Sequence, residues 1–154
     1  MEITFKHCCN IKQTIKPPIG GFLFLYMKDI KEYILENRKI PKENKNGDCY
    51  VVAYRYFMSN GNKNKDLRLV HGLVTGHGAI KGIVYNHAWC EDIKKNMVLD
   101  YTMPECFQEV PIEVYYALGQ VQKEHKYTMQ EVLDKSVEEG TYGPWEDELK
   151  KNKY

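Results

Sequence analysis

The chain has 154 residues and a formal net charge of +1, from 22 Lys and Arg against 21 Asp and Glu. This length suits one domain with one core, and the content of 43% hydrophobic and 28% charged residues excludes a disordered or fibrous chain. The near-neutral charge gives no reason to expect nucleic acid or an anionic membrane as the main partner. We therefore expect a single domain over residues 1–154.

The N-terminal residues do not resemble a secretory signal, because no basic segment precedes a long apolar run. The most apolar stretch, 19–27, has about half the length of a membrane span, and Lys28 and Asp29 end it. Five cysteines without a repeated spacing fit neither a disulfide framework nor a common zinc motif. We expect a cytoplasmic protein with no membrane partner, no cofactor and no bound metal.

The first half of the chain is predicted to hold an arm and two helices. Residues 1–18 are expected to form an extended arm or a strand, and apolar residues at helical spacing predict a helix within 22–37. After a polar loop, Asp48 is placed to cap a helix that runs from Cys49 to Ser59. This helix is apolar on most of its surface, which is typical of a helix in the middle of a domain.

Three short segments rich in Val, Ile, Leu and Tyr follow, at 67–75, 81–91 and 96–101. Glycines or charged turns separate them, which predicts an antiparallel meander. The glycine-rich stretch 72–82 is predicted to turn a hairpin, since it lacks the Gly-Lys-Ser/Thr ending of a phosphate-binding loop. Helical spacing returns at 111–121 and 128–139, residues 140–145 are expected to form a closing turn, and residues 146–154 a frayed tail. The fold class is therefore α+β.

Cys49 is the candidate nucleophile. A cysteine attacks as thiolate, which is scarce at neutral pH because the free thiol has a pKa of about 8.5. A helix N-terminus stabilises an anion, and a nearby imidazole can take the thiol proton. Cys49 follows an Asn-Gly-Asp turn and begins the predicted central helix. The alternative is that Cys49 is a small apolar residue at the start of a core helix.

His87 is the candidate base, in the middle of a predicted strand. If strand residues alternate sides, His87, Trp89 and Glu91 share one face, while Ala88 and Cys90 point to the other. A lone histidine on a strand is usually structural. The indole of Trp89 on the same face would form the wall of a cleft beside the imidazole, so Trp89 and Glu91 are candidate substrate-binding residues.

Asp100 is the candidate third member, at the end of the next predicted strand. A hairpin would bring this strand beside the one that carries His87. A carboxylate that emerges from an apolar run needs a partner, because burying it alone is costly. Bonding the second imidazole nitrogen would supply that partner and fix the tautomer. The alternative is that Asp100 only caps the turn that follows it.

Three short motifs stand in a fixed order over residues 47–102: Gly47-Asp-Cys49-Tyr, His87-Ala-Trp-Cys-Glu91 and Val98-Leu-Asp100-Tyr-Thr. Together they resemble the papain-like superfamily of cysteine enzymes, and most closely its transglutaminase-like branch. The resemblance implies a central helix carrying Cys49, packed on a small antiparallel sheet carrying His87 and Asp100. The chain departs from that family in being short and in lacking a papain-style upstream Gln, so the backbone N–H of Cys49 is the expected oxyanion donor.

The resemblance implies a hydrolase or acyl-transferase that acts on an amide, peptide or isopeptide bond of a protein or peptide substrate through a thioester. Two alternatives remain open at this point. One is a binding module that keeps the fold without turnover, such as an inhibitor or effector acting on a host protein. The other is a metal-dependent enzyme with ligands among four side chains: His71, His77, His87 and Cys90.

Overall fold

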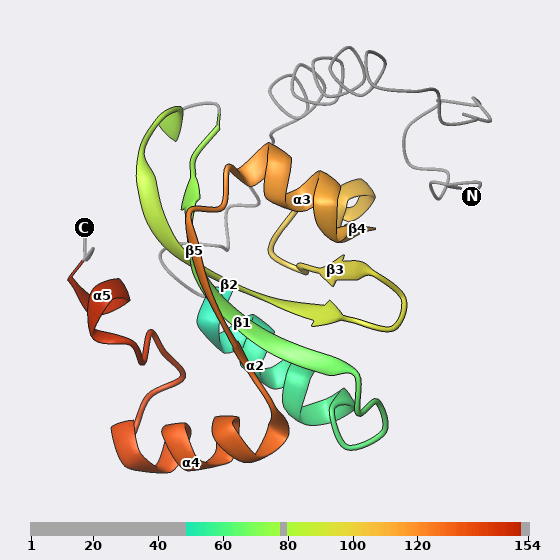
Figure 1. The fold of residues 1–154 in the computed structure, drawn as a ribbon, viewed down its shortest axis with the longest axis vertical. Helices are drawn as coiled ribbons and strands as arrows, with labels where there is room; N and C mark the ends of the chain where they lie inside the picture. Colours follow the sequence, from blue (N-terminus) through green and yellow to red (C-terminus); the bar gives the residue numbers. More distant parts are fainter. Residues whose placement is uncertain (1–48, 78–79, 152–154) are drawn as a thin grey trace.

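The computed structural model describes residues 49–77 and 80–151. The arm expected at 1–18, the helix expected within 22–37 and the cap at Asp48 lie outside these residues. The described elements, in chain order (Figure 1), are α2 (Cys49–Asn60), β1 (Leu67–Thr75), β2 (Val84–Asp92), β3 (Met97–Leu99), the 3-10 helix η2 (Glu105–Phe107), β4 (Glu109–Pro111), α3 (Ile112–Gly119), β5 (Lys123–Tyr127), α4 (Met129–Glu139) and α5 (Asp147–Lys150).

The five strands form one antiparallel sheet in the order β4-β3-β2-β1-β5. The long hairpin of β1 and β2 occupies its middle, with Leu67 opposite Asp92 and Thr75 opposite Val84. This arrangement confirms the α+β class, the expected hairpin over 72–82 and the meander of the first three strands. The sequence did not predict β4 or β5, which form the two ends of the sheet.

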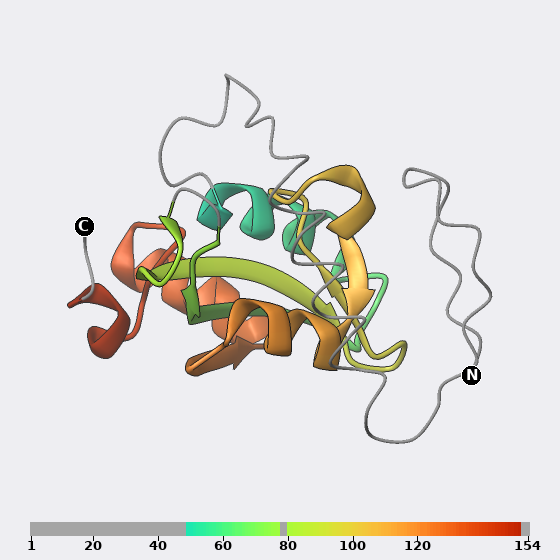
Figure 2. The same ribbon diagram turned by 90° about the horizontal axis from the view of Figure 1, so that it is seen from above.

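Helices cover the sheet on both sides, and Figure 2 shows α2 and α3 on opposite faces. Trp89 packs in the core cluster on the α3 side, together with Val70 and Val98. Ala88 and Cys90 pack in a second cluster, with residues of α2 and α4. The expected alternation along β2 is therefore present. Because both faces are covered, β2 is buried continuously from His87 to Asp92.

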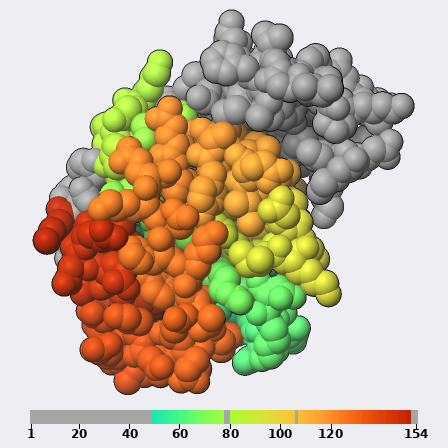
Figure 3. All heavy atoms as spheres, viewed as in Figure 1, coloured from blue at the N-terminus to red at the C-terminus, as the bar shows by residue number. Residues whose placement is uncertain are grey.

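The C-terminal segment differs from the frayed tail predicted for 146–154. Residues Asp147–Lys150 form α5, and Leu149 is 0% exposed. The Leu149 carbonyl accepts a hydrogen bond from Asn86 Nδ2 at 2.6 Å, and Lys150 Nζ lies 3.0 Å from Glu139 Oε1 of α4. Figure 3 shows this segment against the surface of the domain. The prediction of fraying was wrong for 146–151, because one apolar side chain anchors a mostly charged helix; residues 152–154 lie outside the described chain.

The turn at 140–145 closes the second core cluster. Trp145 is 2% exposed, and its ring packs against those of His71 and Tyr127, at centroid distances of 4.7 and 5.0 Å. Tyr50 completes the enclosure of the His71 ring at 4.8 Å. The two ring nitrogens of His71 have no hydrogen-bond partner among the described residues. Burial therefore lowers the pKa of His71 to about 3, with a smaller contribution from His125.

This enclosure makes His71 a source of acid sensitivity. The unfolded chain takes up a proton near the ordinary histidine pKa of 6.5, whereas the native imidazole stays neutral down to about pH 3. Native stability is therefore lost as the pH falls between these values. We expect the free energy of unfolding of His71→Leu to be similar to that of the wild type near pH 8. Near pH 5, the free energy of unfolding of the variant should be about 2 kcal/mol higher than that of the wild type. Denaturant titrations at both pH values test this, and parallel losses in the two proteins would contradict it.

Candidate active site

The site is built around His87, at the point where β3 stops pairing with β2. Strand β3 covers only Cys90–Asp92 of β2 and ends at Leu99. The next residue, Asp100, leaves the sheet beside the stretch of β2 that β3 does not cover, and its Oδ2 lies 2.7 Å from His87 Nε2. Both side chains are buried. The structure thus brings together the histidine and the aspartate that the sequence singled out.

Every oxygen of the Asp100 carboxylate has a partner. Tyr115 of α3 donates its hydroxyl to Oδ2 at 2.8 Å. Thr102 donates its backbone N–H and its hydroxyl to Oδ1, at 3.0 and 2.5 Å. Asp100 therefore both bonds the imidazole and caps the turn that follows it. Burial alone would raise its pKa, but the charge of His87 and these hydrogen bonds hold the pKa of Asp100 below its usual value.

The imidazole of His87 is held in a charged pair. Burial disfavours the imidazolium, but the Asp100 carboxylate outweighs it and raises the pKa of His87 well above 6.5. The Cys49 side chain, a further hydrogen-bond partner of His87, adds to the same rise. Because Nε2 bonds Asp100, Nδ1 is the ring nitrogen left for the thiol. The three sequence-predicted residues therefore meet at one imidazole.

Cys49 is the first residue of α2 and is partly exposed. Cys90, by contrast, is fully buried, and its thiol donates to the Ala53 carbonyl at 3.4 Å. Burial raises the pKa of the Cys90 thiol far above the ordinary cysteine value. Of the cysteines whose side chains the structure describes, only Cys49 is open to a reagent and next to a histidine.

The structure places Trp89 and Glu91 in the interior, so neither side chain is open to a substrate. The Trp89 indole lies beside the His87 ring, with centroids 6.0 Å apart and planes 26° from parallel. Its Nε1 donates to Glu91 Oε1 at 3.0 Å. Glu91 also accepts from the Tyr116 hydroxyl at 2.8 Å and pairs with Lys126 Nζ at 2.7 Å. Their position follows from α3, which covers this face of β2.

Three residues near the site were not singled out from the sequence. Gly72 lies opposite His87, and a Cβ there would meet Trp89 Cη2 at 2.8 Å and the Lys123 carbonyl at 2.6 Å. A residue without a side chain is therefore required for the indole to lie over β1. Thr102 was recognisable in principle, since an Asp followed two residues later by Thr is a common turn pattern. Tyr115 gave no local signal, because its partner is distant in the sequence.

The histidines considered as metal ligands do not gather. His71 is enclosed by aromatic rings, and a ring nitrogen of His77 bonds the Leu118 carbonyl. Across residues 49–77 and 80–151, no three His, Cys, Asp or Glu side chains are arranged to hold a metal ion. None of the described helices combines the length and the apolar character that crossing a membrane requires.

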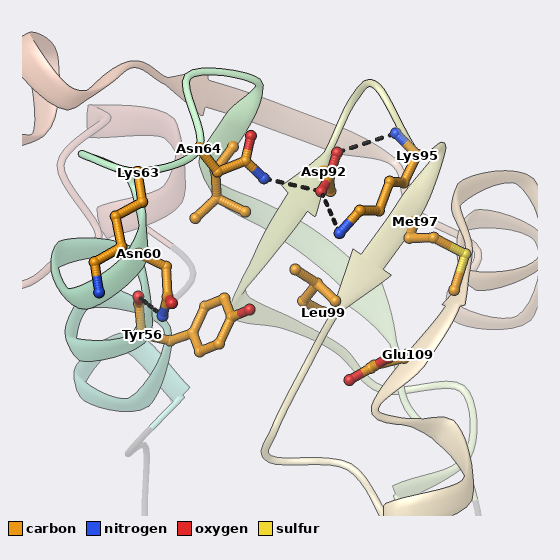
Figure 4. Close-up of a pocket in the computed structure, with 10 residues that line it drawn as sticks. Tyr56, Asn60, Lys63, Asn64, Asp92, Lys95, Met97, Leu99 and Glu109 are labelled. Carbon is orange, nitrogen blue, oxygen red and sulfur yellow. Dashed lines mark hydrogen bonds and ion pairs between the residues drawn. The ribbon is translucent and has the colours of Figure 1, made fainter. Parts of the chain in front are cut away.

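A polar pocket of about 290 Å³ lies at the C-terminal end of α2, away from Cys49 (Figure 4). Its walls include Tyr56, Lys63 and Asp92. The Asp92 carboxylate accepts from Asn64 Nδ2 at 2.9 Å and pairs with Lys95 Nζ at 3.3 Å. This pocket contains none of the three residues that meet at the imidazole, and the partners of Asp92 do not include a histidine.

Comparison with known proteins adds no relative: no family model, no curated protein and no solved structure matches this chain. The functional interpretation therefore depends on the geometry of the site itself.

Replacing Asp100 tests whether it controls the imidazole. In Asp100→Asn the burial that lowers the pKa of His87 remains while the opposing charge is lost. We therefore expect the pKa of His87 to fall, and the free energy of unfolding to fall by about 1.5–3 kcal/mol near neutral pH. Imidazole proton shifts followed by NMR against pH measure the first effect. Asp92→Asn, which neutralises a buried carboxylate that does not bond the imidazole, is the matched control and should leave the His87 titration unchanged. The same pKa of His87 in the wild type, Asp100→Asn and Asp92→Asn would show that Asp100 does not control the charge of His87.

Proposed function

We propose that this chain is a cysteine-nucleophile hydrolase or acyl-transferase that acts on an amide, peptide or isopeptide bond of a protein or peptide substrate. Cys49 is the nucleophile, His87 carries the proton, and Asp100 orients His87. The observation that carries the proposal is the buried imidazole, which is fixed at Nε2 by a carboxylate 2.7 Å away and whose pKa is also raised by the thiol of the residue that begins α2.

The charge state of this site suits thiol chemistry. With its pKa well above 6.5, His87 is an imidazolium at neutral pH, and Asp100 stays ionised beside it. An imidazolium next to a cysteine stabilises the thiolate, and it is also the acid that a departing amine needs. The N-terminal position of Cys49 on α2 adds backbone N–H groups that stabilise anions.

In the proposed reaction, Sγ of Cys49 attacks the carbonyl carbon of the substrate. The backbone N–H of Cys49 donates to the oxygen on which negative charge develops. The C–N bond then breaks, the amine leaves with the proton of His87, and a thioester remains on Cys49. Water or an amine next attacks the thioester, gives its proton to His87 and releases Cys49.

A papain-like core of the transglutaminase-like kind is part of the proposal. Its support is that a cysteine-bearing helix packs on an antiparallel sheet, with the histidine on one strand and the aspartate directly after the next.

The thiol–imidazole pair can be tested by alkylation. We expect iodoacetamide at about pH 6 to modify Cys49 at least about tenfold faster in the wild type than in His87→Ala, because the mutation removes the group that stabilises the thiolate. Asp100→Ala should fall between the two. Peptide mass spectrometry locates the label, and thermal melts show whether each variant is folded.

Two controls accompany this test. His125→Ala removes a histidine that pairs with Glu148 on the surface, and should leave the rate at Cys49 unchanged. Cys49→Ala should remain folded and lose the rapidly labelled peptide. A folded His87→Ala that reacts with the wild-type pH profile would exclude the catalytic pair, and a binding module without turnover would then be the better interpretation.

A further inference from the structure

A small apolar cavity of about 50 Å³ adjoins the imidazole of His87. It lies between the C-terminal end of α3, the ends of β1 and β2 that are joined by their hairpin, and the segment that follows Asp100. Its apolar walls come from seven side chains: Val74, Tyr85, Met103, Phe107, Val110, Tyr115 and Leu118. Neither Asp92 nor any other residue of the polar pocket contributes to it.

Three polar groups in the wall of this cavity are already engaged. The Tyr115 hydroxyl and His87 Nε2 both bond Asp100. A ring nitrogen of His77 bonds the carbonyl of Leu118. A polar group that entered would lose its water and find few partners, which is unfavourable, whereas an aliphatic group would gain by leaving water.

The position beside His87 determines which part of a substrate reaches this cavity. In the proposed reaction the carbonyl carbon is bound to Sγ of Cys49, and the imidazolium gives its proton to the leaving atom. The substituent on the leaving atom is therefore the part of the substrate nearest to the imidazole. By microscopic reversibility, a nucleophile that attacks the thioester occupies the same place.

We infer that this cavity is the subsite for a small aliphatic substituent carried by the leaving group, or by the accepting amine, of the reaction at Cys49. A cavity of about 50 Å³ is a few times larger than the about 10–15 Å³ that one water needs, so it holds about three or four carbon atoms. The inference depends on the proposed function, because it assigns a substrate class to the same site.

Two thioesters that differ at one position provide the test: S-propyl thioacetate and S-(2-hydroxyethyl) thioacetate. Each donates an acetyl group to Cys49; the new bond joins the carbonyl carbon to Sγ, the old C–S bond breaks, and the leaving thiolate takes the proton of His87. The two leaving groups differ only at their end, where the propyl group has a methyl and the hydroxyethyl group has a hydroxyl. Mass spectrometry measures acetyl-Cys49, and acetylation of free N-acetylcysteine corrects for the intrinsic reactivity of each donor. After correction we expect the S-propyl donor to react about tenfold faster.

Variants at the cavity show whether it causes the preference. Gly119 lines the cavity, and a Cβ placed there lies 3.8 Å from Val74 Cγ1, an ordinary contact. Gly119→Leu should fill the space and bring the corrected ratio close to one, and Gly119→Ala should give an intermediate ratio if the larger variant unfolds. Ala117→Leu, at an exposed position of the same helix, should keep the wild-type ratio.

The outcomes separate the two proposals. A Cys49 whose alkylation does not depend on His87 overturns the proposed function. If that dependence holds, two results overturn the subsite alone: equal corrected rates for the two donors, or an unchanged preference in folded Gly119→Leu or Gly119→Ala. No acetylation of Cys49 by either donor would overturn both proposals, because the proposed function requires acyl transfer to this thiol.

Discussion

The buried carboxylate of Asp100 is the group on which the site depends. An isolated carboxylate in the interior is unstable, and this one persists because four hydrogen bonds reach its two oxygens, from His87, Tyr115 and Thr102. These partners come from β2, from α3 and from the turn after β3. The same contacts that make the burial of Asp100 tolerable therefore join three parts of the chain and fix the ring of His87. A second nitrogen of that ring remains for Cys49.

Strand β2 connects this electrostatic arrangement to the packing of the domain. One of its faces meets α3 and the other meets α2, so the strand is enclosed where it carries His87. Trp89 and Glu91 support that strand from within, and Lys126 neutralises Glu91 from β5. The alternating pattern around His87 thus reflects a strand buried on both sides. Trp89, which the sequence suggested as the wall of a cleft, lies in the interior and packs beside the His87 imidazole there.

Much of this was predictable because it is local. Helix α2, the strands β1 to β3 and the later helices carry apolar residues at regular spacing, and the approach of Asp100 to His87 follows from one hairpin. The short strands were missed for a physical reason: β5 buries only Tyr127, so its sequence shows no alternation, and β4 has three residues. Tyr115 and Leu149 act through partners far away in the chain, which no local pattern reveals.

The two outer strands also bear on how copies of this domain meet one another. An exposed strand edge can template pairing with a second molecule, and short or charged edges resist it. Among the described residues, one edge is β4, which ends at Pro111, a residue without a backbone N–H, and the other is β5, with Lys123, Glu124 and Lys126 exposed. Extension of the sheet from molecule to molecule is disfavoured at both ends. The charged residues of β5, which prevented its prediction as a strand, therefore also disfavour aggregation through this edge.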